Sequence, residues 1–372
     1  MKIGVPKEIK NQEYRVGMTP TAARELVLHG HDVVVQSDCG HAIGLEDSDY
    51  RTAGATVVET ADDVFTAADL IVKVKEPLAQ EMPLLREGQV LFTYLHLAPD
   101  PDLTRKLRDT GCIAVAYETV TDNRGGLPLL APMSEVAGRM AIQAGAHCLE
   151  LRQGGRGTLL SGVPGVPVGK VCVLGGGVVG TNSARMAMGL EASVTVVDIS
   201  LSRLYDLDLQ FGPTLNTIYS TRDAVEQLVT EADLVVGAVL VPGAAAPKLV
   251  TEDMVRGMKR GSVIVDVAID QGGCMETSRP TTHTEPTYVE HGVVHYCVTN
   301  MPGAVARTST FALNNATLPF IVSLADKGVK GAMEEDAHLL NGLNVFKGCI
   351  TYEAVARDTG EEFVAPLDAL AA

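Results

Sequence analysis

The sequence predicts an α/β protein with two doubly wound parallel-sheet (Rossmann-like) domains and an active site in the cleft between them. Short runs of apolar, β-branched residues alternate with helical patterns along nearly the whole chain. This alternation is typical of parallel sheets joined by crossover helices. At 372 residues, the chain is long for one core and of a natural length for two domains.

The first alternating series runs from residue 1 to about 128. Its strand-like runs are KIGV near the start, HDVVV at 31–35, ATVV at 55–58, DLIVKV at 69–74, QVLFTYL at 89–95 and CIAVAY at 112–117. Helical patterns such as TPTAARELVLHG lie between them, and there Thr19 suits the N-cap and Gly30 the C-cap. This region is expected to have its own core.

A second series follows the Gly- and Pro-containing break DNRGGLPLLAP at 122–132. The segment SEVAGRMAIQAGAHCLEL is expected to be one long linking helix. Six strand-like runs come next, which fits a dinucleotide-binding sheet: VCVL, SVTVVD, TIYS, ADLVVGAVL, GSVIVDVAI and GVVHYCV. Residues 307–372 have mainly helical patterns and are expected to return to the first domain. The expected division is residues 1–128 with 307–372 as the substrate domain and residues 129–306 as the NAD-binding domain.

The strongest local signal is the glycine motif GxGxxG at Gly175, Gly177 and Gly180, between two strand-like runs and opening a helical stretch. Such glycines allow a tight turn, close approach of a pyrophosphate to the backbone, and close packing of helix on strand. Asp198 ends the next strand, where a carboxylate accepts hydrogen bonds from ribose hydroxyls and repels the 2′-phosphate of NADP. NAD is therefore the expected cofactor, although Arg203 offers a nearby cation.

Composition limits the remaining classes of function. The net charge is −16 and no basic cluster occurs, which argues against a nucleic-acid partner. No apolar run approaches the roughly 20 residues that span a bilayer, and the first residues lack a secretory leader, so a cytoplasmic location is expected. The seven cysteines contain no CxxC, which favours reduced core thiols over disulfides or a zinc site.

Four polar residues follow four different predicted strands, where ligands bind in open α/β sheets. They are Arg15, Lys75, His96 and Asp270. Arginine can hold a carboxylate bidentately, lysine can stabilise charge on a carbonyl oxygen, and imidazole exchanges protons near neutral pH. A carboxylate can orient water or ammonia and stabilise a cationic iminium. The set predicts hydride transfer to or from a small acid.

Each of these residues also has a purely structural interpretation. Considered alone, Arg15 fits a surface loop arginine, and His96 fits a hydrogen-bonded structural histidine. Lys73 shares a strand face with Lys75, and Lys73 is the better candidate for a solvated side chain. Asp270 precedes QGG and fits a turn or a helix cap. The functional interpretation depends on the convergence of all four.

Long segments resemble the alanine dehydrogenase family nearly end to end. They are PKEIKNQEYRVGMTP, VKVKEP, LFTYLHLAP, APMSEVAGRMAIQAGAHCLE, GGGVVGTNSARMAMGL, VDVAIDQGGCMETSRPTTH and VTNMPGAVARTSTFALNNATLP. The resemblance implies reversible oxidative deamination of L-alanine by NAD to pyruvate, ammonium and NADH. It also implies a homohexamer with two doubly wound domains in each subunit.

Carried over residue by residue, the resemblance makes His96 the acid/base residue and Asp270 the second catalytic residue. It makes Arg15 and Lys75 substrate-binding residues and adds Asn300, near the nicotinamide. The implied cofactor contacts are Ser134, Gly175, Gly177, Gly180, Asp198, Arg203, Ser220, Val239, Leu240, Val267 and Met301. The region of Arg203 and Ser220 follows the family pattern more loosely. No metal is expected.

Two alternatives stay open at this point. The NAD-binding subunit of proton-translocating transhydrogenase shares the glycine loop and the KE and RV opening, but that family has an Arg-Gln-Asp-bearing loop where this chain has APMSEVAG. A catalytically silent NAD-binding sensor on the same fold is the other. A sensor would be free to lose His96 or Asp270, and both are present.

Overall fold

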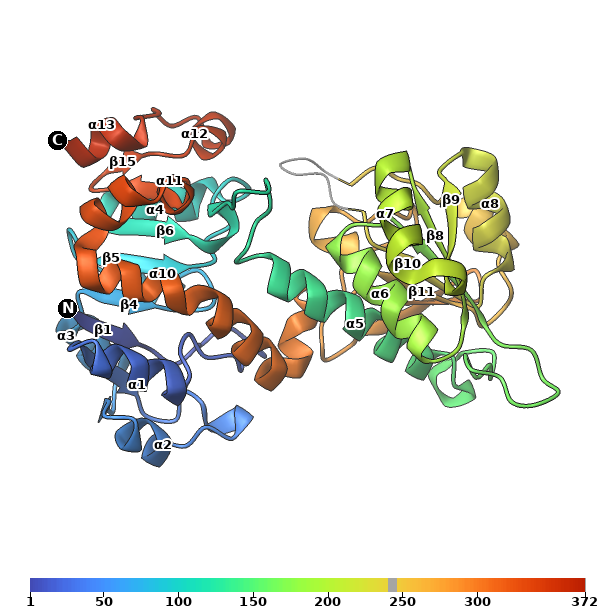
Figure 1. Ribbon diagram of the computed structural model, residues 1–372, viewed down its shortest axis with the longest axis horizontal. Helices are drawn as coiled ribbons and strands as arrows, with labels where there is room; N and C mark the ends of the chain where they lie inside the picture. Colours follow the sequence, from blue (N-terminus) through green and yellow to red (C-terminus); the bar gives the residue numbers. More distant parts are fainter. Residues whose placement is uncertain (240–245, 372) are drawn as a thin grey trace. The chain divides into compact units, whose positions relative to one another are not determined.

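The computed structural model describes residues 1–239 and 246–371, and it divides the chain into two compact units. Unit 1 comprises Met1–Met133 and Val305–Ala372, and unit 2 comprises Ser134–Ala304. Each unit is a mainly parallel sheet with helices packed on it (Figure 1). The predicted α/β fold class with two doubly wound sheets is confirmed.

The sheet of unit 1 has eight strands in the order β15-β14-β6-β5-β4-β1-β2-β3. All six predicted strand-like runs form parallel strands, and their bounds are β1 Lys2–Val5, β2 Asp32–Gln36, β3 Thr56–Val58, β4 Leu70–Val72, β5 Val90–Thr93 and β6 Ile113–Ala116. Two further strands, β14 (Leu343–Phe346) and β15 (Cys349–Ile350), extend the edge by antiparallel pairing. The expectation of mainly helical structure after residue 307 misses these two strands.

Helices cover the unit 1 sheet on both faces. They are α1 Pro20–Leu28, α2 Asp47–Thr52, α3 Ala61–Ala67, α4 Pro101–Asp109, α10 Ala306–Glu335, α11 Ala337–Leu340, α12 Glu353–Thr359 and α13 Pro366–Ala371. The predicted N-cap is confirmed, because the Thr19 side chain accepts a hydrogen bond from the amide of Ala22. Thr19 is also bonded to Asn314 of α10, with 3.0 Å from the Thr19 amide to Oδ1. The C-terminal segment thus contacts the start of α1 within unit 1.

The sheet of unit 2 has seven strands in the order β12-β13-β11-β10-β7-β8-β9. The six predicted strands form the parallel part, and their bounds are β7 Lys170–Leu174, β8 Ser193–Asp198, β9 Asn216–Tyr219, β10 Leu234–Gly237, β11 Val263–Asp266 and β13 Val293–Tyr296. A seventh, β12 (Thr287–Glu290), was not predicted and pairs antiparallel with β13 at the edge. The order reverses between β7 and β10, the point where doubly wound sheets bind their ligands.

The helices of unit 2 include the predicted linking helix. They are α5 Ala131–Cys148, which begins in unit 1, then α6 Val178–Gly189, α7 Leu201–Phe211, α8 Arg222–Glu231 and α9 Glu252–Gly257. Helix α6 packs on β7 and β8 through small buried residues such as Ser183, Ala184 and Ala187. No helix in the described ranges is both long and apolar enough to cross a bilayer. All seven cysteines are free, and only Cys349 is not fully buried.

Candidate functional site

Three of the four predicted site residues lie at one edge of the unit 1 sheet. Strands β1, β4 and β5 are neighbours in the sheet, and Arg15, Lys75 and His96 follow them in that order. The carboxyl ends of parallel strands meet at a single edge, so the three side chains share one region. Asp270 follows β11 in unit 2.

Arg15 is buried, so its interpretation as a surface loop residue is wrong. Its exposed fraction is 2%, and its guanidinium donates from Nε to Oε1 of Glu13 at 2.7 Å and from Nη2 to Oε2 at 2.6 Å. Burial opposes the charge, but the hydrogen bonds and charge of Glu13 raise the pKa of Arg15 above its ordinary value. Nη1 lies 3.2 Å from Sδ of Met133. The Nε–Nη2 edge of the guanidinium is therefore occupied by Glu13.

The two lysines after β4 also differ from expectation. Lys73, expected to be solvated, is fully buried, with Nζ 2.6 Å from Oε1 of Glu81 and 3.4 Å from Oε2 of Glu8. Lys73 directly follows β4, whose three residues are all buried between covering helices, so its side chain does not reach water. Lys75 is half-buried, and burial together with the nearby charge of Arg15 lowers its pKa. A lysine with a lowered pKa is suited to bind or protonate a carbonyl group.

His96 combines an exposed side chain with a constrained backbone. Its φ is +50°, in the left-handed region that non-glycine residues seldom occupy. The carboxylate of Glu118 supports this backbone by accepting the amide N–H of His96 at 2.6 Å and that of Leu95 at 3.1 Å. The ring stacks on Tyr94, with centroids 6.0 Å apart. Sequence reasoning missed Glu118, whose only signal is its place two residues after β6.

The glycine loop of unit 2 has the backbone shape that a pyrophosphate needs. Gly175 has φ +98°, and a Cβ added to Gly180 would lie 1.8 Å from the carbonyl oxygen of Gly175. Gly177 is the N-cap residue of α6, and a Cβ there would meet no atom within 4 Å. The loop is thus tightly packed at Gly180 and open at Gly177, the N-terminus of α6. There the amide groups and the helix dipole favour anions.

Residues expected at the adenosine end gather around this loop. Asp198 accepts the amide of Gly176 at 2.7 Å through Oδ2 and that of Ser200 at 2.8 Å through Oδ1. Arg203 donates from Nε to the carbonyl of Gly176 at 2.6 Å. The amide of Ser220 donates to the carbonyl of Asp198 at 3.0 Å. Asp198 and Arg203 therefore shape the glycine loop directly.

Asp270 is exposed on the 3-10 turn η6 (Val267–Gln271) that follows β11. The cap role considered for Asp270 belongs to buried Asp266, whose carboxylate accepts the amide of Ala268 at 3.2 Å and the hydroxyl of Ser278 at 2.6 Å. Burial raises the pKa of Asp266, against the effect of these hydrogen bonds. Sequence reasoning missed Asp266, which sets the turn that carries Asp270.

The other expected contacts are placed individually. Asn300 has φ +61° and its carbonyl accepts the amide of Gly303 at 2.9 Å, at the start of the 3-10 helix η7 (Met301–Val305). Met301 is buried in the unit 2 core, and Ser134 lies in the first turn of α5. Val239 lies two residues after β10, and Val267 begins η6. Leu240 lies outside the described residues.

Comparison with known proteins gives two family matches that together span most of the chain. Residues 4–137 match the model described as alanine dehydrogenase/PNT, N-terminal domain, and residues 141–353 match alanine dehydrogenase/PNT, C-terminal domain. The chain is 62% identical over 364 residues to an alanine dehydrogenase of Halomonas elongata, covering 98% of each sequence. It is 55% identical over 365 residues to an alanine dehydrogenase of Bacillus subtilis, covering 98% of this chain and 96% of the relative.

Solved structures agree with these matches. An L-alanine dehydrogenase superposes with a TM-score of 0.94 at 54% identity, covering 97% of this chain and 99% of that one. A transhydrogenase from Sinorhizobium meliloti superposes with a TM-score of 0.83 at 26% identity, covering 94% and 100%. From its sequence matches, its two sheets and the residues at their strand ends, the chain belongs to the alanine dehydrogenase/PNT family.

Proposed function

We propose that the protein is an NAD-dependent L-alanine dehydrogenase that interconverts L-alanine with pyruvate and ammonium. One observation carries the proposal within the family: Arg15, Lys75 and His96 stand on three adjacent strand ends of one sheet. They provide a buried cation, an amine with a lowered pKa and an exposed imidazole. A small 2-oxo acid has a carboxylate for the cation and a carbonyl oxygen for the amine. Its reduction also takes up a proton, which the imidazole can supply.

The chemistry assigned to the unit 1 residues follows from their surroundings. Lys75 binds the carbonyl oxygen of pyruvate and stabilises the charge that develops there. Arg15, fixed by Glu13, supplies positive charge for the substrate carboxylate. His96 exchanges the proton that must accompany redox change at the substrate carbon. The nicotinamide of NAD supplies the hydride acceptor.

The residues of unit 2 are proposed to serve the cofactor and the amino group. The glycine loop binds the pyrophosphate, because its backbone is tight at Gly180 and open at Gly177. Asp270 orients water or ammonia, and Asn300 and Met301 lie near the nicotinamide. Asp198 favours NAD over NADP through its carboxylate at the end of β8. The proposed division of labour is residues 1–128 with 307–372 as the substrate domain and residues 129–306 as the NAD-binding domain.

The deciding experiment is NADH formation by the purified protein with L-alanine and NAD, with D-alanine and NADP as controls. We expect activity with L-alanine and NAD alone. Comparable rates with NADP would refute the role of Asp198. NADH binding without turnover would support the silent sensor or the transhydrogenase subunit instead.

A matched variant separates chemistry from folding. His96→Ala is expected to abolish turnover while NADH binding, measured by fluorescence, stays near wild type. Loss of both would identify His96 as a structural residue.

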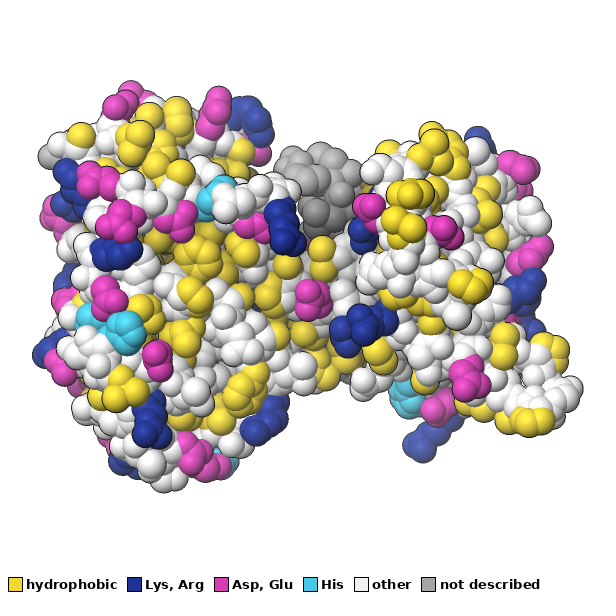
Figure 2. All heavy atoms as spheres, in the orientation of Figure 1, with side chains coloured by type: hydrophobic (Ala, Val, Ile, Leu, Met, Phe, Trp, Pro, Cys, Tyr) yellow, Lys and Arg dark blue, Asp and Glu magenta, His cyan; other side chains and the backbone are white. Residues whose placement is uncertain are grey.

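We also propose that the protein works as a cytoplasmic homohexamer. The cytoplasmic location is supported by seven free cysteines, which persist in a reducing compartment. Assembly is supported by a hairpin of unit 2, residues 157–169, which contains no charged residue although 20% of the chain is charged. Hydrophobic side chains gather on this hairpin (Figure 2), and Leu159, Val163 and Val166 are each more than half exposed. Charge-free apolar surface is typical of interface cores.

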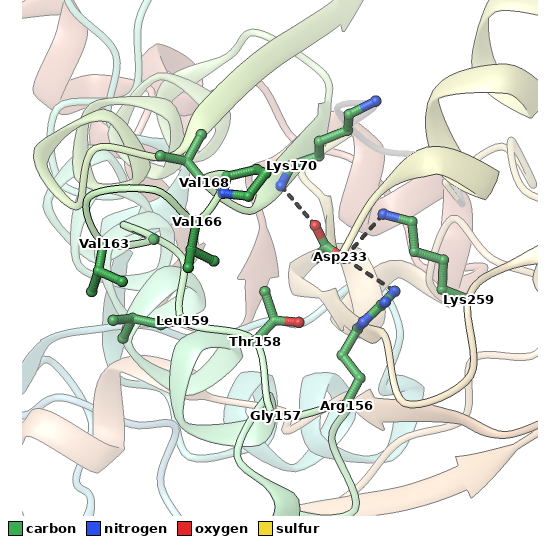
Figure 3. Close-up of a pocket in the computed structure, with 12 residues that line it drawn as sticks. Arg156, Gly157, Thr158, Leu159, Val163, Val166, Val168, Lys170, Asp233 and Lys259 are labelled. Carbon is green, nitrogen blue, oxygen red and sulfur yellow. Dashed lines mark hydrogen bonds and ion pairs between the residues drawn. The ribbon is translucent and has the colours of Figure 1, made fainter.

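The hairpin is well fixed at its base. It lines a pocket of about 470 Å³ together with an ion cluster in which Asp233 lies 3.2 Å from Nη1 of Arg156 and 3.0 Å from Nζ of Lys259 (Figure 3). Its tip is a turn with Val163 paired to Val166. A fixed apolar protrusion loses little entropy when it binds another subunit.

Light scattering tests this assembly. Wild type is expected to be hexameric, and Val163→Asp is expected to give smaller species. Leu28→Asp, at an exposed leucine of unit 1, is the control and should leave the hexamer intact. A monomeric wild type would overturn the proposal.

A further inference from the structure

The two lysines beyond β4 differ in what surrounds their ammonium groups. Lys73 contacts the carboxylates of both Glu8 and Glu81, and the three side chains are at most 3% exposed. In the described part of the chain, no carboxylate lies within ion-pair distance of the Lys75 ammonium. Lys73 therefore has two acidic partners, whereas Lys75, two residues later, has none within that distance.

The remaining acids near Lys75 have other cationic partners. Glu13 is paired with Arg15, with 2.6 Å from Nη2 to Oε2, and Glu76 is paired with Lys10. Arg15, Lys10, Glu76 and Glu13 are the charged groups that face Lys75. Since each acid is bound by another cation, none of them needs to turn toward the Lys75 ammonium.

Glu8 also contacts the backbone that carries Lys75. Its Oε1 accepts the amide N–H of Val74 at 2.7 Å and that of Lys75 at 3.3 Å, while its Oε2 faces Lys73. On the other side, the carbonyl of Lys75 accepts the hydroxyl of Thr93 at 2.9 Å. Glu8 and Thr93 thus hold both polar groups of one peptide segment.

Lys73 is what allows Glu8 to remain an acceptor in this buried place. Burial raises the pKa of Glu8, and the charge of Lys73 opposes this rise. In turn, the charges of Glu8 and Glu81 outweigh burial and raise the pKa of Lys73. A buried carboxylate without a cation would take up a proton or find another partner, and Lys75 is the nearest candidate on the same segment.

We propose that Glu8, Lys73 and Thr93 are positioning residues for Lys75. Glu8 and Thr93 fix its backbone, and Lys73 retains Glu8 and Glu81 so that the Lys75 ammonium is left for an anionic or carbonyl-bearing substrate. The inference deepens the proposed function, on which it depends for the identity of that substrate.

Steady-state kinetics with pyruvate, ammonium and NADH tests the backbone part. We expect Glu8→Ala to lower kcat/KM for pyruvate about tenfold or more, because small displacements of a binding group are costly, with NADH affinity unchanged. Glu8→Gln keeps an oxygen acceptor and should restore most of this loss. Thr93→Val conserves shape and should lower kcat/KM by a smaller factor; it also serves if Glu8→Ala does not fold.

The control is Gln89→Ala. Gln89 is 2% exposed, directly precedes β5 at the end opposite to Thr93, and donates to the carbonyls of Phe65 and Ala68. It should lower the melting temperature without changing kcat/KM for pyruvate. The proposal is overturned if Glu8→Ala and Gln89→Ala affect kcat/KM alike, or if Thr93→Val has wild-type kinetics.

Acetylation of lysines with acetic anhydride, followed by mass spectrometry over a pH series, tests the charge part without any turnover. In wild type, Lys75 should react at lower pH than exposed lysines, and Lys73 should not react. In Lys73→Met the released carboxylates should move the Lys75 midpoint to higher pH, and an unchanged midpoint would contradict the proposal. If wild type lacks alanine activity, the proposed function fails while this measurement still decides the inference.

Discussion

The two units place different chemical groups at the strand ends that are proposed to bind ligands. In unit 1 the site depends on buried ion pairs, Arg15 with Glu13 and Lys73 with Glu81, beside the half-buried Lys75 and the exposed His96. In unit 2 the corresponding edge is made of backbone, with Gly180 packed against Gly175. A small substrate with one carboxylate is recognised by oriented cations, whereas a pyrophosphate is recognised by amide groups and space. The first strategy is sensitive to loss of charge and the second to added volume.

Removing a buried partner in unit 1 should have the largest effect. Without Glu13 the buried guanidinium of Arg15 loses its bidentate acceptor, and such losses cost about 3–5 kcal/mol of stability. We expect Glu13→Ala to lower the free energy of unfolding by about that amount in urea titrations. A loss below about 1 kcal/mol would show that charge is not what fixes unit 1.

The next largest effect is expected when side-chain volume is added to the glycine loop of unit 2. Gly180→Ala places a methyl group 1.8 Å from a backbone oxygen, and overpacking costs about 1–3 kcal/mol or more. We expect a lower melting temperature without cofactor and weak NADH binding. Gly177→Ala meets nothing within 4 Å, so the melting temperature should stay and only NADH affinity should fall. If both variants behaved alike, the division into a packed and an open side of the loop would be wrong.

The neighbouring lysines should give stability changes of opposite sign. The pKa of Lys75 is lowered in the folded protein, so folding opposes its charge at neutral pH, and this penalty disappears as pH rises from the lowered pKa toward the ordinary value of 10.5. Lys75→Met should therefore be inactive yet more stable at pH 7, with the gain vanishing above pH 10.5. Lys73→Met should be destabilised instead. Melting curves across this pH range test both variants. Stability changes of the same sign would contradict the proposed difference between Lys73 and Lys75.

The smallest effect is expected for an exposed ion pair in unit 1. Arg105 and Asp102 are bonded on α4 with side chains 46% and 78% exposed. Such pairs contribute about 0.2–1 kcal/mol, so Arg105→Ala should lie within about 0.5 kcal/mol of wild type and lose its effect in high salt. If Arg105→Ala lowered the free energy of unfolding as much as Glu13→Ala, burial would not explain the strength of the ion pairs in unit 1.

The sequence predicted the parallel strands of both sheets because their apolar runs are continuous and separated by helical patterns. It missed β12, β14 and β15, which are short antiparallel strands at or next to a sheet edge and carry little periodicity. It placed Arg15, Lys75 and His96 at strand ends correctly from their positions after apolar runs.

What the sequence could not show is how these residues are held. The partners of Lys73 are 65 and 8 residues away, and Glu118 is 22 residues from His96, so no local pattern connects them. Likewise Asp266 and Asp270 both follow an apolar run, and only the fold shows that the first is buried and the second exposed. Pairing over long sequence distances is a property of the sheet order.

That sheet order has a consequence for the folding kinetics. Glu8 follows β1 and reaches the backbone beyond β4, while Glu118 follows β6 and reaches the backbone beyond β5. Each contact requires two strands to pair, β1 with β4 for Glu8 and β5 with β6 for Glu118. Contacts that depend on such pairing form late because their loop-closure cost is met first. During refolding, helical circular dichroism should therefore recover before the left-handed turn at His96 is in place, and the site matures as a late step of sheet assembly.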